Sequence, residues 1–219
     1  MKNIKLKNFL IIAYICFSVL VFAMVLIIPQ TREVFKQLSN NHPYIMGFVK
    51  FALLATAGEL IAALIANSKT SVPVKIVWRF VIWGFIGVWI TFMMKVFSVA
   101  AGSLMASGML PGGNSVFLKA FYTSVIMNTT FGPTFMAIHK GTDKILELSN
   151  KKEKVSVNSV ISGIDWTNFV GFTLFKTVPL FWIPAHTVTF LLPVQYQVMM
   201  AAALSVALGI ILSLGNRKK

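Results

Sequence analysis

A run of 20 residues without a charge, residues 9–28, constrains this chain more than any other feature of its sequence. At about 1.5 Å per residue, a helix of this length crosses a hydrocarbon core of about 30 Å. Five further apolar runs cover residues 44–66, 76–101, 115–138, 164–191 and 194–214. The sequence therefore predicts an all-α fold: a polytopic membrane helical bundle of about six transmembrane helices, forming a single membrane domain over residues 1–219.

The distribution of charge separates two explanations for the excess of basic residues. The chain contains 20 Lys and Arg against 6 Asp and Glu, a formal net charge of +14. In a soluble protein such an excess indicates a polyanionic partner such as nucleic acid. Here 57% of the residues are hydrophobic, and most basic residues lie in short segments between the apolar runs. This pattern is typical of membrane topology, so we expect a lipid bilayer and no nucleic acid as the partner.

Basic residues also predict the orientation of the chain. With the N-terminus inside, the outer loops contain only Arg32 and Lys36. The inner segments contain Lys2, Lys5, Lys7, Lys69, Lys75, Arg79, Lys140, Lys144, Lys151, Lys152, Lys154, Arg217, Lys218 and Lys219. Both termini and the hydrophilic loop 140–163 are therefore predicted to be cytoplasmic, in a bacterial cytoplasmic membrane. A short surface helix at the start of this loop is compatible with its sequence, and the loop is too short to form a soluble catalytic domain.

Small residues spaced by four predict how the helices pack. In lipid, close backbone approach takes the place of a hydrophobic force between helices. Such residues recur on the second run at Gly58 and Ala62, and on the sixth run at Ala201, Ser205 and Gly209. The fourth run carries a mixed stripe of Ala120, Ser124, Asn128 and Gly132. Helix packing is the expected role, and a polar pore lining is the alternative for the mixed stripe.

Two prolines interrupt the fifth run. Pro179 and Pro184 each lack a backbone donor and leave a carbonyl one turn earlier without its helical partner. A kink is predicted at these positions. The kink either shapes the helix bundle only or also serves as a gate for the solute.

Polar and charged residues within the apolar runs are the candidate solute contacts, because such residues are costly in hydrocarbon. The predicted pore-lining or solute-contacting set is Glu59, Lys95, Asn128, Lys176 and His186. Lys176 lies near the middle of its run, where a structural ion pair with Glu59 is the alternative to a solute contact. Asn128 is followed by two threonines that extend the polar patch.

Lysines near the outer helix ends have a second explanation. Lys50, Lys95 and Lys119 lie within reach of the headgroups, so snorkelling is the favoured explanation for these three. If they converge with Lys176 on one cavity instead, the solute is expected to be a small anion.

Nothing in the sequence indicates an enzyme. It lacks a nucleotide-binding loop, metal-ligand spacing and a nucleophile triad, and its single cysteine, Cys16, lies within an apolar run. We therefore expect no catalytic residue, no metal and no cofactor.

The C-terminal region carries a motif in which a Trp and a Pro precede a polar residue, an aromatic residue and another Pro. Its residues are Trp182, Pro184, His186, Thr189, Phe190, Pro193 and Tyr196. Weaker motifs lie upstream: GFIG at 84–87 followed by Lys95, NTTFGP at 128–133, and Gly58-Glu59. Together they resemble the Mpv-seventeen and peroxisomal-membrane-protein-twenty-two family. Met127 and Gln197 stand where that family has Asp and often Arg.

The resemblance implies a pore-forming or solute-permeability protein that passes small solutes across a membrane. A substrate-binding membrane subunit of a vitamin-type importer and a non-transporting membrane scaffold are the alternatives. The family resides in peroxisomal and mitochondrial inner membranes, which are the alternatives to the bacterial cytoplasmic membrane favoured by the basic loops and by an uncleaved N-terminal anchor. A homo-oligomer is compatible with this prediction.

Overall fold

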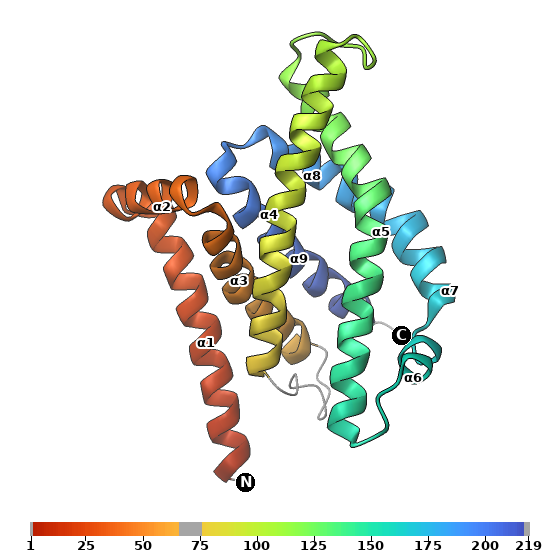
Figure 1. The fold of residues 1–219 in the computed structure, drawn as a ribbon. Coiled ribbons are helices and arrows are strands. Elements are labelled where there is room, and N and C mark those ends of the chain that lie inside the picture. The colour runs from red at the N-terminus through yellow and green to blue at the C-terminus, as the bar shows by residue number, and fades with distance from the viewer. Residues whose placement is uncertain (1, 66–75, 217–219) are drawn as a thin grey trace. The chain divides into compact units, whose positions relative to one another are not determined.

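The computed structural model describes the backbone of residues 2–65 and 76–216 and the side chains of residues 9–65 and 76–211 (Figure 1). Helix is the regular secondary structure of these segments, and the all-α prediction is confirmed for them. Several basic residues of the predicted cytoplasmic segments have side chains outside the described residues. They are Lys2, Lys5, Lys7, Lys69, Lys75, Arg217, Lys218 and Lys219.

The chain forms two compact units. Unit 1 comprises Met1–Thr91 and Val194–Lys219, and unit 2 comprises Phe92–Pro193. Helix α4 (Ile76–Ala106) is continuous across the boundary and contributes to both. The single membrane domain expected over residues 1–219 stays a prediction.

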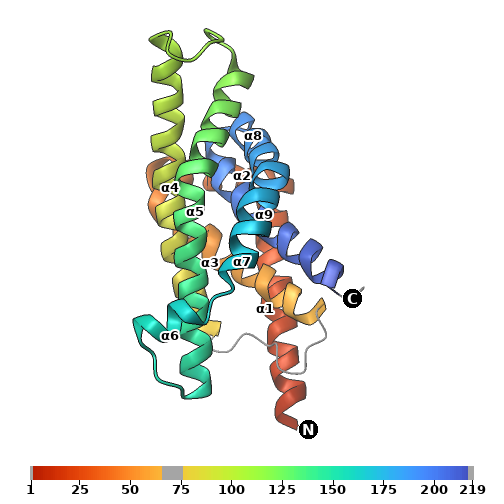
Figure 2. The same ribbon diagram turned by 90° about the vertical axis from the view of Figure 1, so that its right-hand side faces the viewer.

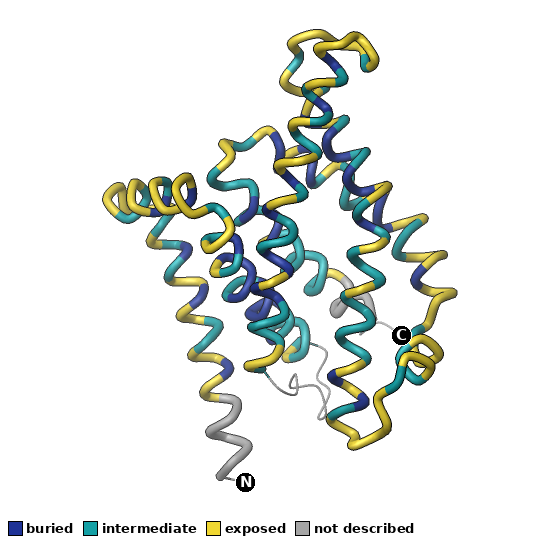
Figure 3. The backbone as a smooth tube through the Cα atoms, viewed as in Figure 1, coloured by how far each residue is buried: buried dark blue, intermediate teal, exposed yellow. Residues whose placement is uncertain are grey.

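Unit 1 contains α1 (Lys2–Ile27), α2 (Pro29–Asn41), α3 (Pro43–Ile65), the first half of α4, and α9 (Val194–Asn216). Its most extensive contact joins α3 and α9, and buried residues are concentrated on α3 (Figure 3). By contrast, α1 exposes large apolar side chains, as a helix facing lipid would.

Helix α2 occupies part of a segment that is predicted to be an outer loop. Ile28 adopts an extended conformation that ends α1, and Pro29 then begins α2, a position where its fixed φ favours a helix. In Figure 1, α2 lies across the adjoining ends of α1 and α3. Arg32 and Lys36 are therefore helical residues rather than loop residues.

Unit 2 contains the second half of α4, α5 (Val116–Lys151), α6 (Val157–Ser162), α7 (Trp166–Asn168), η1 (Phe169–Trp182) and α8 (Ile183–Leu191). Helices η1 and α8 run alongside α5, with α8 in the more extensive contact (Figure 2). Between α4 and α5 the chain turns through glycines with positive φ, of which Gly112 has φ +115°.

Helix α5 continues well beyond the apolar run, so the predicted loop 140–163 is a loop only in part. Ion pairs within the helix support its charged end: Glu147 accepts from Lys151 at 2.7 Å and from Lys144 at 3.0 Å. Hydrogen bonds from Lys151 and Lys144 also lower the pKa of Glu147. The helix ends where Lys152 adopts a left-handed conformation, with φ 57°.

The two prolines of the fifth run lie in an irregular helix. Residues Phe169–Trp182 form a π-helix that contains Pro179, and Pro184 lies in the first turn of α8. The five-residue hydrogen-bond step is visible where the Ile183 N–H donates to the Val178 carbonyl. The irregularity predicted at these prolines therefore takes the form of a long π-helix followed by an α-helix.

Four helical segments among the described residues are long and apolar enough to cross a membrane. They are Phe9–Ile27, Pro43–Ile65, Ile76–Ala106 and Val194–Ile211. They correspond to the first, second, third and sixth predicted runs.

Candidate functional site

A buried polar cluster lies between α5 and α8 in unit 2. It consists of Ser124 and Asn128, one turn apart on α5, and of His186 on α8 with Trp182 one turn before it. Asn128 and His186 are 3% and 9% exposed, and Ser124 is fully buried. The structure thus brings together two of the five residues predicted to contact solute.

The hydrogen bonds of this cluster join the two helices. The Ser124 hydroxyl donates to the Ile183 carbonyl at 2.7 Å. The Asn128 amide donates to the Ser124 carbonyl at 2.8 Å. His186 Nδ1 lies 3.0 Å from Asn128 Nδ2 and 3.1 Å from Asn128 Oδ1. The tautomer of the histidine decides whether Nδ1 accepts from the amide nitrogen or donates to the amide oxygen.

The other side of the imidazole defines what the cluster can bind. The His186 ring stacks on the Trp182 ring at 5.1 Å, which fixes its plane. His186 Nε2 has no hydrogen-bond partner among the described side chains and backbone groups. The cluster can therefore offer one polar ring nitrogen to a small molecule, as donor or acceptor.

All four residues of the mixed stripe on α5 face inward. Ala120, Ser124, Asn128 and Gly132 are all buried. Thr129 and Thr130, which extended the predicted polar patch, are exposed and donate to carbonyls of their own helix. The inward polar groups of α5 are thus Ser124 and Asn128 rather than the threonines.

Three of the predicted lysines have surface positions. Lys95, Lys119 and Lys176 are exposed, and none of them contributes to the buried polar cluster. Surface positions agree with the snorkelling prediction for Lys95 and Lys119.

Glu59 belongs to unit 1 and has a partner there. Its carboxylate accepts from Arg79 at 2.7 Å, with both side chains about one-fifth exposed. Arg79 is therefore an ion-pair partner of Glu59 within unit 1. The sequence marks Arg79 only as a basic residue of an inner segment, and it gives no signal for this pair, whose members are 20 residues apart. Lys176 belongs to unit 2, and its pairing with Glu59 stays a prediction.

Lys50 does not snorkel. It is 3% exposed, its ammonium donates to the Gln195 carbonyl at 2.9 Å, and it lies 4.5 Å from the centre of the Phe35 ring. The snorkelling prediction is wrong for this residue because a backbone carbonyl and an aromatic face, both within unit 1, hold the charge.

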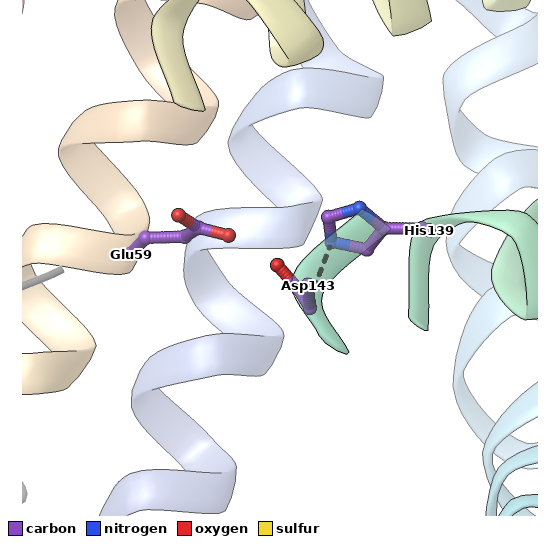
Figure 4. A group of neighbouring side chains, drawn as sticks. All are labelled: Glu59, His139 and Asp143. Carbon is purple, nitrogen blue, oxygen red and sulfur yellow. Dashed lines mark ion pairs between the residues drawn. The ribbon is translucent and has the colours of Figure 1, made fainter. Parts of the chain in front are cut away.

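His139 is also paired within its own helix. Its Nε2 lies 3.6 Å from an Asp143 carboxylate oxygen, one turn along α5 (Figure 4). Glu59, which the same figure labels, is a residue of unit 1.

The small-residue stripes of the second and sixth runs meet in unit 1. Gly58 on α3 lies against Val206 on α9, and Gly209 on α9 lies against Ala62 on α3. Ala201 is buried, and the Ser205 hydroxyl donates to the Ala202 carbonyl. These contacts give each stripe a packing role.

Comparisons of the chain with protein-family models, with curated proteins and with solved structures found no match.

Proposed function

We propose that this chain is an integral membrane protein that lets small solutes cross the bilayer, with six spans. The four long apolar helices support four of these spans. Two further helices support the remaining ones: α5 has 36 residues, and α7, η1 and α8 form one uninterrupted helical segment from Trp166 to Leu191. Both exceed the roughly 20 residues that a span requires.

The proposed orientation places both termini in the cytoplasm of a bacterial cell. The basic segments support it, because inner loops carry the excess of Lys and Arg. Reporters fused to the C-terminus and to the α4–α5 turn test it. A reporter active only in the cytoplasm should work at the C-terminus and fail in the turn, and the reverse result would contradict the orientation.

The observation that carries the proposed function is the buried polar cluster. Polar side chains between helices in hydrocarbon also serve packing, but an ionisable residue such as His186 is costly there and is a candidate for a functional role. Asn128 bonds to both Ser124 and His186, the Ser124 hydroxyl donates to the Ile183 carbonyl, and His186 Nε2 stays available. Because the cluster contains no acid or lysine, it suits a small polar solute that is neutral or carries little charge.

The resemblance to the Mpv-seventeen and peroxisomal-membrane-protein-twenty-two family supports the same role. His186 lies in the C-terminal motif and Asn128 in the NTTFGP motif, so two segments that carry the resemblance meet in this cluster.

Solute flux in vesicles tests the proposal. The full chain is reconstituted, and stopped-flow light scattering measures entry of glycerol and of chloride as its potassium salt. Asn128→Leu and His186→Leu should each reduce glycerol flux about tenfold, the change expected when one hydrogen bond of about 1–1.5 kcal/mol to the solute is lost. Thr130→Val, on the exposed side of α5, is the matched control and should leave flux unchanged.

The outcomes separate passage from the other roles. Flux that stays at the level of empty vesicles for every solute would contradict a permeability function and favour a scaffold. Flux unchanged in both cluster variants would reduce the cluster to a packing contact. An ATPase that copurifies with the chain would favour a vitamin-type importer.

A further inference from the structure

Unit 1 contains an apolar pocket in the angle between α1, α2 and α3. Its volume is about 400 Å³, within the range of about 300–1,000 Å³ typical of small-molecule sites. Phe22 from α1, Val34 and Phe35 from α2, and Leu53 from α3 contribute to its walls. Lys50 is the one charged residue among those that line it.

Lys50 brings a positive charge to this apolar wall without an acidic partner. Its ammonium contacts the Gln195 carbonyl and the Phe35 ring, and no acidic side chain among the described residues pairs with it. A carbonyl and an aromatic face stabilise a cation but do not neutralise it. A buried cation in this state favours an anion as the missing partner.

Helix α2 carries another cationic side chain, Arg32, which lacks one of its hydrogen-bond partners. Arg32 Nε is buried and has no hydrogen-bond partner among the described residues. By contrast, Lys36 on the same helix is paired with Glu33 at 2.7 Å. The α2 end of unit 1 therefore presents more positive charge than its own acids compensate.

The location of the pocket restricts the kind of anion. Helices α1 and α3 are both long and apolar enough to span, and α2 lies across their adjoining ends (Figure 1). A pocket in this angle lies where the headgroups of a bilayer meet the acyl chains. An apolar volume beside a cation then matches a molecule with a hydrocarbon tail and a negatively charged head.

We propose that the pocket binds an anionic phospholipid, with one acyl chain between α1, α2 and α3 and the phosphate near Lys50. This proposal does not depend on solute passage, because the pocket belongs to unit 1 and the buried polar cluster to unit 2. The lipid would supply the counter-charge that the described residues do not offer to Lys50 and would fix α2 against α1 and α3.

Native mass spectrometry of the full-length protein in detergent tests the proposal. The probes are dioleoyl phosphatidylglycerol, dioleoyl phosphatidylcholine and oleate, added at equal concentrations. The wild-type protein should retain phosphatidylglycerol about fivefold more than phosphatidylcholine, the ratio expected for one lysine near an anionic headgroup. Lys50→Met should abolish this preference, and Lys50→Arg should keep it. Lys36→Met removes a charge that is already paired and should leave the preference unchanged.

A variant of the pocket itself tests the apolar half of the site. Val34 is 55% exposed and lines the pocket, so Val34→Trp should fill the volume without disturbing a packed core. This variant should lose bound phosphatidylglycerol while the protein keeps its helical circular dichroism.

Three outcomes would overturn the proposal. The first is equal retention of the two phospholipids by the wild-type protein. The second is oleate displacing phosphatidylglycerol, which would make a free fatty acid the occupant. The third is undiminished lipid in Val34→Trp. If Lys50→Met fails to fold, the wild-type preference and Val34→Trp decide the question.

Discussion

Gly58 on α3 provides a direct test of the close approach between α3 and α9. A Cβ added at this position would lie 2.7 Å from Val206 Cγ2 and 2.9 Å from Val206 Cα. Because the second of these atoms belongs to the backbone, rotation of the valine side chain cannot remove the conflict. Ordinary contact for a Cβ begins near 3.4 Å, so α9 would have to move by about 0.5 Å.

The magnitude follows from two opposing effects of Gly58→Ala. Overpacking of a close contact costs about 1–3 kcal/mol. Alanine in place of glycine inside a helix returns about 1 kcal/mol. The net result should be a loss of about 0–2 kcal/mol in the free energy of unfolding.

Gly209→Ala is the matched control on the opposite helix of the same interface. A Cβ there would lie 3.6 Å from the Ala62 Cβ, an ordinary contact. This variant should therefore gain up to about 1 kcal/mol from helix propensity. The free energies of unfolding of both variants are measured in mixed detergent micelles, with tryptophan fluorescence as the signal. Trp83, which stacks on Phe51 in unit 1, is a suitable reporter. If Gly58→Ala were as stable as Gly209→Ala, the close approach of α3 and α9 would be refuted.

Three further perturbations test other parts of the fold. Glu59→Gln and Arg79→Gln should each destabilise the protein, with a coupling of about 0.5–3 kcal/mol in a double-mutant cycle; additive effects would argue against their ion pair. Ser156→Ala removes the capping box of α6 and should cost about 1 kcal/mol of local stability, seen as faster amide exchange in α6 only. Gly112→Ala forces a side chain onto φ +115° and should cost about 1–3 kcal/mol in a thermal melt, whereas Gly113→Asn, at φ +53° in open space, should be tolerated.

The amino-acid sequence predicts the apolar helices well because hydrophobic length is a local property. The first and the sixth predicted apolar runs correspond to α1 and α9. The second and the third correspond to α3 and α4, and all four helices are long and apolar enough to span. The prediction from apolar runs misses α2, because the polar residues of this helix lower the hydropathy of the segment. Pro29 at the first helical position was the signal that could have identified this helix.

The length of α5 was underestimated for a related reason. The apolar run stops near Ile138, but the backbone continues as a helix through Lys151. The supporting interactions there are ion pairs between residues three and four apart, around Glu147. A hydropathy window registers these charges only as the end of a span, although their spacing is typical of an exposed helix.

The contacts of the candidate site could be predicted only in part. Asn128 and His186 were each identifiable as polar residues within apolar runs, but 58 positions separate them in the sequence and no spacing rule connects them. Lys50 shows the same limit. Its burial depends on the Gln195 carbonyl, 145 residues away, and a backbone group leaves no trace in residue composition.

A π-helical turn corresponds to an α-helical turn into which one residue has been inserted. Each residue removed from the stretch Phe169–Trp182 would turn the following helix by about 100° around its axis. His186 follows this stretch, so its direction toward Asn128 depends on how many residues precede it. Loss of a single codon there would break the buried contact as thoroughly as replacing the histidine, although every residue of the cluster would still be present.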